Sequence, residues 1–107
     1  MTTFDDRERA FEAKFAHDEE MAFRVTARRN KLLGQWAAGL MKLTPEETDA
    51  YSKAVVQAEF EEAGDEDVVR KLLGDLIAAG VEIDDGAVRQ ALDHQMIEAR
   101  RQLLEAK

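Results

Sequence analysis

The sequence contains no cysteine, a single proline, and one serine at position 52. The lack of cysteine excludes disulfide bonds within the chain, thiolate catalysis and zinc sites built on cysteine. Proline interrupts helices, so a chain with only one places little restriction on helical backbone. The longest apolar runs are a few residues, far short of the roughly 20 that a membrane-spanning helix needs. We expect a helical protein that does not insert directly into a membrane.

Positive charge is also scarce, because 15 basic residues face 23 acidic ones and the formal net charge is −8. A negative surface repels nucleic-acid phosphates and anionic lipid headgroups, so nucleic acid is not expected as a partner. Hydrophobic residues still make up 45% of the 107 residues, which is enough for one modest core in one domain. The opening residues lack the apolar segment of a secretory signal, so export is not expected.

Motifs that support catalysis or metal binding are missing as well. His17 and His94 stand far apart, and neither belongs to an HExxH pattern. Ser52 lies in no GxSxG elbow, and no GxxxxGK[ST] loop is present to wrap phosphates. The acidic run at residues 65–67 lacks the ligand spacing of an EF-hand, and we interpret it as helix capping. We therefore expect no catalytic residue, no metal site and no enzyme activity.

What the sequence does contain is strong helix signals. Residues 44–47 read Thr-Pro-Glu-Glu, in which the threonine can cap a helix, the proline suits the first helical position and the second glutamate can close a capping box. Gly64 and Gly80 follow apolar patterns at places where a helix can end. An Asp-Asp-Gly run at residues 84–86 opens the last segment. These signals separate segments that are each long enough for a helix.

In four stretches of the chain, apolar residues recur at the spacing of a helix. These stretches are residues 23–40, 51–62, 68–77 and 88–103. Trp36 and Tyr51 lie on these stripes, so we interpret them as core residues rather than as ligand-stacking platforms. Short connections favour antiparallel neighbours. The pattern predicts an all-α protein with a four-helix bundle-like domain over residues 20–107.

Residues 1–19 differ from this domain, because they combine high charge with three spaced phenylalanines. On a helix, Phe4, Phe11 and Phe15 fall within roughly 40° of arc, which makes a narrow aromatic stripe. An isolated helix of this length is marginal in water. We predict a flexible amphipathic N-terminal arm, disordered or partly helical when free. Two roles stay open: the arm docks on its own bundle, or it inserts into the groove of a partner.

The most concentrated positive cluster is Arg-Arg-Asn-Lys at residues 28–31. Such a cluster can hold a phosphate group or an acidic partner surface. The alternative is a solvated helix face, because adjacent residues on a helix point in different directions and cannot all grip one ligand. The candidate ligand-binding residues are therefore Arg28, Arg29 and Lys31, and the solvated helix face stays open as the alternative.

Several stretches are familiar. The opening MTTFDDRERAFEAKFAHD resembles the start of the zeta subunit of alpha-proteobacterial F-type ATP synthase. The similarity continues through ARRNKLLG at residues 27–34 and FEEAGDEDV at residues 60–68, with shorter matches at residues 36–38 and 70–72. After Gly80 the helical pattern alone is shared. The resemblance spans nearly the whole chain and implies a four-helix regulatory protein.

The resemblance further implies an inhibitor of ATP hydrolysis whose N-terminal segment enters the catalytic head of the synthase. The matching segment contains the candidate partner-binding residues Phe4, Arg7, Arg9, Phe11, Lys14 and Phe15. The expected location is the cytoplasm, on the cytoplasmic face of the inner membrane through the synthase. No cofactor is expected to be required.

Adenine nucleotide binding is also associated with this family, so ATP or ADP is a candidate regulatory ligand. The candidate nucleotide-binding residues are Arg28, Arg29 and Lys31. Two alternatives to the inhibitor stay open: an adenine-nucleotide-sensing helical module, and a helical adaptor that binds without changing ATP turnover. Measurements of ATP hydrolysis separate these classes.

Overall fold

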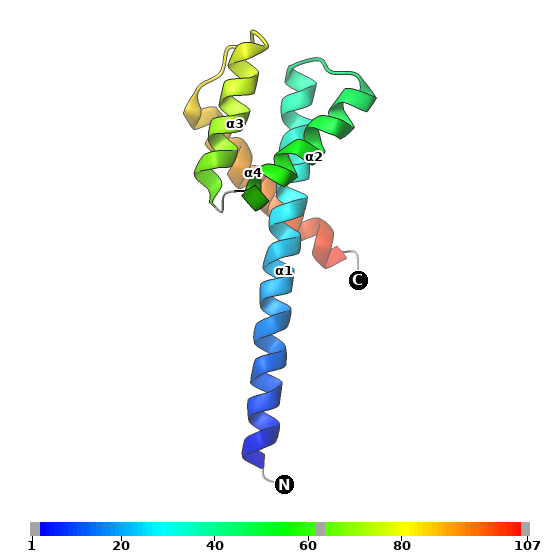
Figure 1. Ribbon diagram of the computed structural model, residues 1–107, viewed down its shortest axis with the longest axis vertical. Helices are drawn as coiled ribbons and strands as arrows, with labels where there is room; N and C mark the ends of the chain where they lie inside the picture. Colours follow the sequence, from blue (N-terminus) through cyan, green and yellow to red (C-terminus); the bar gives the residue numbers. More distant parts are fainter. Residues whose placement is uncertain (1–2, 62–63, 106–107) are drawn as a thin grey trace.

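Four α-helices make up the described part of the chain in this computed structural model (Figure 1), with the order α1 (Thr3–Leu40), α2 (Pro45–Glu61), α3 (Asp65–Ala78) and α4 (Asp85–Glu105). The structure describes the backbone of residues 3–61 and 64–105, and the side chains of residues 19–59 and 64–105. Those residues contain no strand, so the predicted all-α, four-helix class is confirmed. None of the described helices combines the length and hydropathy that crossing a membrane requires.

Helix α1 is the longest element and runs through 38 residues without a break. At 1.5 Å per residue it spans roughly 57 Å. The longest dimension of the molecule is 65 Å, so α1 sets most of it. The second half of α1 packs among the other helices, whereas the first half extends beyond them (Figure 1). The helix shows no interruption at the predicted boundary between residues 19 and 20, and the division into arm and domain stays a prediction.

Local capping residues explain where α2 begins. The backbone N–H of Thr44 donates to Oε1 of Glu47 at 2.9 Å, and the N–H of Glu47 donates to Oγ1 of Thr44 at 3.2 Å. This reciprocal pair is the predicted capping box, and it satisfies two backbone donors that the helix itself leaves unpaired. The hydrogen bond from the Thr44 backbone also lowers the pKa of the Glu47 carboxyl.

The start of α3 differs from its prediction. The N-cap residue is Gly64, with φ 130°, and it forms no side-chain capping bond. The acidic first turn lies at the positive end of the helix dipole, as expected. However, Oδ1 of Asp65 accepts a hydrogen bond from Arg29 of α1 at 3.0 Å. The prediction of a side-chain cap at residues 65–67 is therefore wrong, because a tertiary ion pair takes the carboxylate.

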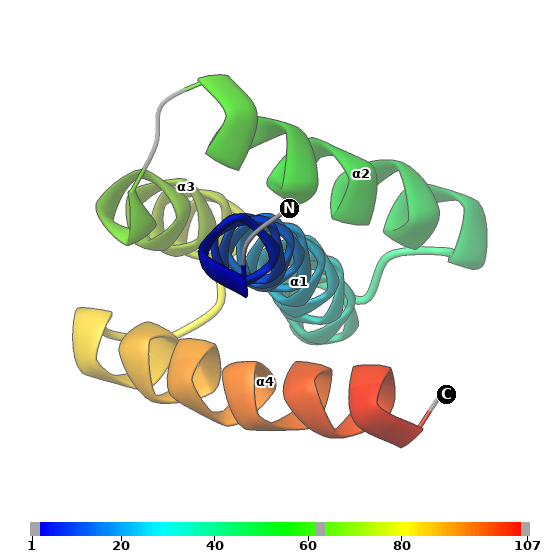
Figure 2. The same cartoon turned by 90° about the horizontal axis from the view of Figure 1, so that it is seen from below.

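The apolar core lies where the second half of α1 meets the other helices, which lie on three sides of it (Figure 2). Its fully buried members come from all four helices and include Leu33, Val55, Leu72, Leu76 and Val88. Trp36 and Tyr51 pack against this core as partly buried side chains, as predicted. A hydrogen bond of 2.7 Å from the Tyr51 hydroxyl to Asp75 joins α2 to α3. This core holds the second half of α1 in place and thereby fixes the direction in which the first half projects.

Candidate functional site

The first half of α1 contains the six predicted partner-binding positions. The backbone of these positions belongs to α1, and their side chains lie outside the described residues. They are Phe4, Arg7, Arg9, Phe11, Lys14 and Phe15. Because a helix pairs its own backbone groups, the backbone of this segment needs no partner. The structure presents the segment away from α2, α3 and α4 (Figure 1).

The register of α1 relates this projecting segment to the core. At 100° per residue, positions 4, 11 and 15 and positions 25, 29 and 33 all fall within a sector of roughly 80°. Val25, Arg29 and Leu33 at the latter positions are buried against the other helices. The same face therefore continues along the first half of α1, where none of the other described helices lies beside it (Figure 1). A continuous helix face that loses its neighbours halfway suits a partner that replaces them.

A buried polar cluster ties α1 to the helices around it. The side chain of Arg29 is 2% exposed, and its Nη2 lies 3.0 Å from Oδ1 of Asp65 and 3.7 Å from Oε2 of Glu59. Its Nε donates to Oδ1 of Asn30 at 3.0 Å, and Nδ2 of Asn30 donates to Glu59 at 3.4 Å. A buried guanidinium without such partners is costly. Arg29 therefore joins α1 to α2 and to the first residue of α3.

A second feature is a shallow groove of about 500 Å³ beside α1, which we call the basic groove. Three cations of α1 line this groove, namely Arg24, Arg28 and Lys31. Their spacing of i, i+4 and i+7 places them on one face of the helix. Apolar side chains of Phe23, Ala27, Val56 and Leu103 complete the lining. No lining residue carries a carboxylate, and Arg24 pairs with Glu20 one turn earlier on α1 at 2.6 Å. In a chain with an acidic surplus, this is a local concentration of positive charge.

The structure separates the three candidate nucleotide-binding residues. Arg28 and Lys31 line the basic groove, and Nη1 of Arg28 donates to Oε1 of Gln102 on α4 at 3.0 Å. Arg29 instead lies on the buried side of α1, because adjacent residues project about 100° apart. Sequence reasoning missed Arg24, although its spacing from Arg28 and Lys31 would have indicated a shared face. The assignment of a nucleotide to these residues stays a prediction.

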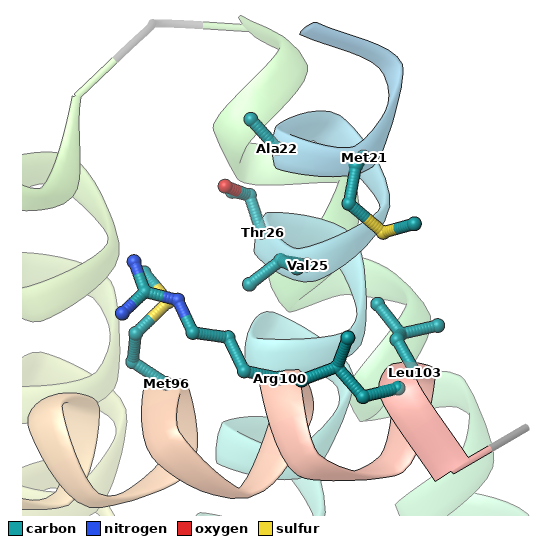
Figure 3. A pocket seen from close by; sticks show the side chains of 8 residues that line it. Met21, Ala22, Val25, Thr26, Met96, Arg100 and Leu103 are labelled. Atoms are coloured by element: carbon teal, nitrogen blue, oxygen red, sulfur yellow. The ribbon is translucent and has the colours of Figure 1, made fainter. Parts of the chain in front are cut away.

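A third feature is a groove of about 400 Å³ between α1 and α4, which we call the α1–α4 groove. Its lining is mostly apolar and includes Met21, Val25, Met96, Arg100, Leu103 and Leu104. Figure 3 shows Met21 and Val25 on α1 facing Met96 and Leu103 on α4 across this space. Sequence reasoning did not find this groove, since it depends on how α1 and α4 diverge rather than on any local motif.

Comparison with known proteins adds to this geometry. The family model described as ATPase inhibitor subunit zeta matches residues 1–102. A chain solved by solution NMR is similar to this one with 42% sequence identity and a TM-score of 0.72, over 81% of this chain and 99% of that chain. No curated protein matches at a significant level. The fold of the solved chain therefore agrees with the four-helix arrangement described above.

Proposed function

Because the chain belongs to the ATPase inhibitor subunit zeta family, we propose that it blocks ATP hydrolysis by inserting the first half of α1 into the catalytic head of F-type ATP synthase. The observation that supports this mechanism most directly is the projecting helix of Figure 1. The family description names an inhibitor, which supports a regulatory rather than a catalytic role. Binding to the head would hold the protein at the cytoplasmic face of the inner membrane.

The proposed mechanism is steric. Catalytic interfaces of a rotary machine must open and close in each cycle, and a helix held between two subunits prevents closure without any reactive group. Burial of each phenylalanine contributes roughly 1.5–3 kcal/mol. The cations Arg7, Arg9 and Lys14 would pair with acidic residues of the head, which favours rapid and specific association. Binding in the helical form of α1 would need less ordering than binding of an unfolded segment.

The test is inhibition of ATP hydrolysis by purified head, measured with the full chain and with Phe11→Ala. Loss of one buried phenylalanine is expected to raise the half-inhibitory concentration about 10- to 100-fold. The matched control is Ile77→Ala, which removes an exposed apolar side chain of α3 and is expected to change inhibition less than about twofold. A charge reversal, Arg9→Glu, should slow association.

Removal of residues 1–19 provides the decisive comparison, with helicity measured to show that the remaining helices persist. Inhibition by this shortened chain as strong as that of the full chain would disprove the arm mechanism. If both chains bind to the head and neither changes the rate of ATP hydrolysis, the protein is instead a helical adaptor.

A second candidate function, adenine nucleotide sensing, is favoured by the basic groove. Arginine and lysine side chains on one face can bind phosphates, and the apolar lining offers contact surface for a base. The groove lies on α1 immediately after the projecting segment, so a bound nucleotide would act on the helix that carries the arm. This arrangement would link inhibition to the energy state of the cell.

Titration of the chain with ATP, followed by amide chemical shifts, tests this second function. Shifts are expected at Arg24, Arg28 and Lys31, and they should disappear in Arg28→Glu but persist in the control Arg70→Glu on α3. Silence of all three amides at millimolar ATP would remove the basic groove as the nucleotide site.

A further inference from the structure

Helix α4 carries apolar side chains that stay exposed beside its contact with α1. Met96 and Leu103 line the α1–α4 groove, and Leu104 at its edge keeps 63% of its surface exposed. Two turns earlier on α4, Ile97 is 69% exposed. A hollow lined by apolar side chains, with further exposed apolar side chains at its rim, can receive an apolar side chain of another protein.

Arg100 places a positive charge in this apolar setting. The other arginines whose side chains are described each have a hydrogen bond or ion pair, for example Arg24 with Glu20 and Arg101 with Glu105. For Arg100 the described residues provide no such partner, and Figure 3 shows its side chain lying along the groove toward Met96. A carboxylate brought next to it would form a charge-assisted pair in a partly apolar environment. The groove thus fits an apolar side chain with a carboxylate nearby.

The groove lies where the projecting half of α1 leaves the domain. Met21, which lines the groove, follows Phe15 by six positions on one uninterrupted helix, or roughly 9 Å along its axis. A surface that surrounds the helix at Phe15 therefore reaches the groove without any bend in α1. The groove is continuous with the interface that the proposed function assigns to the arm.

We infer that the α1–α4 groove is a second docking site for the catalytic head. It receives an apolar side chain and an adjacent carboxylate from the head surface that borders the arm's entry point. This inference rests on the proposed function and adds a contact that holds the domain against the head after the arm has entered. Aromatic and arginine anchors in apolar pockets typically dominate such interfaces.

Two other occupants fit the structure less well. The arm itself can reach the groove only by breaking α1 near residues 16–20, where the helix is continuous. A second copy whose own groove faced this one across a two-fold axis would bring Arg100 close to Arg100 of the other copy, and like charges at an interface oppose association. The head surface avoids both costs.

The test measures binding of full-length variants to immobilised head. Arg100→Glu and Leu104→Asp alter exposed side chains of the groove, and each is expected to speed dissociation about tenfold. The matched controls are Arg70→Glu and Ile77→Asp, which make the same kinds of change on the exposed face of α3 and should stay within about twofold of the unaltered chain. Phe11→Ala reports on the arm in the same assay. Helicity of each variant shows that the fold is kept.

The outcomes separate the two proposals. If both groove variants dissociate from the head as slowly as the unaltered chain while Phe11→Ala binds more weakly, the groove inference is wrong and the proposed function stands. Unchanged binding of Phe11→Ala would overturn the proposed function, and the inference with it. Two results in the isolated chain would overturn the inference. NMR contacts between Met96 and Phe11 or Phe15 would assign the groove to the arm, and a dimer that the Leu104→Asp variant no longer forms would assign it to a second copy.

Discussion

At the scale of single residues, two neighbouring helices approach each other through one glycine. A Cβ atom at Gly34 of α1 would lie 2.6 Å from Cα of Ser52 on α2, closer than real contacts allow. The hydroxyl of Ser52 donates to the backbone oxygen of Thr48 at 2.8 Å, so this small polar side chain is satisfied within its own helix. Within a helix, a glycine is expected to cost stability relative to alanine. In the structure Gly34 allows the closest crossing of α1 and α2.

Replacement of this glycine is the first prediction. Gly34→Ala is expected to destabilise the fold by about 1–3 kcal/mol, because the backbone of α2 must move away. Gly74→Ala is the matched control, since its Cβ meets nothing in the middle of α3 and the change should stabilise by about 0.5–1 kcal/mol. Urea unfolding monitored by circular dichroism measures both. Equal effects of the same sign would show that helix propensity, rather than the crossing, decides these positions.

At the scale of helices, the buried cluster around Arg29 determines how α1, α2 and α3 are joined. Arg29 reaches Asp65 across 36 positions of sequence and contacts Glu59 of α2 on the way. These partners differ in exposure, with side-chain exposed fractions of 54% for Asp65 and 21% for Glu59. The partly buried Glu59 therefore depends most on the guanidinium. The cluster holds the start of α3 against the helix that carries the arm.

The second prediction concerns this cluster. Arg29→Met keeps most of the side-chain volume but removes the charge, and it is expected to destabilise the fold by about 2–3 kcal/mol, less than a fully buried pair because Asp65 is half exposed. The control is Arg101→Met, which loses only exposed pairs within α4 and should cost at most about 0.5 kcal/mol. Denaturant unfolding compares the two variants. A loss at Arg29 as small as that at Arg101 would contradict the structural role assigned to the cluster. Adding Glu59→Gln to Arg29→Met should recover part of the loss.

At the scale of the whole molecule, hydrogen-bonded glutamates make stability depend on pH in a defined direction. Hydrogen bonds lower the pKa of three glutamates: Glu47 through the Thr44 backbone, Glu66 through Arg89, and Glu98, to about 2, through Arg101. A carboxyl whose pKa is lower in the folded state binds more protons when unfolded. The stability that such a carboxyl contributes is therefore present when the pH is above its unfolded-state pKa of 4.5, and it is lost as the pH falls below that pKa.

The third prediction follows from this direction. The melting temperature should stay nearly level from pH 7 to pH 5 and decrease between pH 5 and pH 2. Glu66→Gln should flatten part of that decrease, because it removes the titrating carboxylate that accepts two hydrogen bonds from Arg89 and connects α3 to α4. Glu82→Gln, at a side chain with no hydrogen bond or ion pair among the described residues, serves as the control. Thermal melts followed by circular dichroism at each pH provide the measurement, and a rise in melting temperature below pH 5 would contradict the prediction.

The candidate sites were predictable only in part. The aromatic stripe of residues 1–19 and the basic run at residues 28–31 are visible in the sequence, and both lie on α1. The sequence does not show that Arg28 and Arg29 differ completely in burial, because both share the same local pattern. Nor does it show the α1–α4 groove, whose two walls are about 75 positions apart along the chain. Contacts of that separation depend on packing angles between helices.

The sequence by itself determined the all-α class, the capping box that begins α2, the glycine that ends α3 and the family to which the chain belongs. The helix signals depend on residues within about four positions of each other, the range of a helical hydrogen bond, and the family resemblance depends on the order of residues along the chain. Only the tertiary structure decided that Arg29 is buried, that Asp65 binds it instead of capping α3, and that Arg100 lies in an open apolar groove. Each of these depends on which helix faces are brought together, because a side chain acquires its distant partners only when the helices pack.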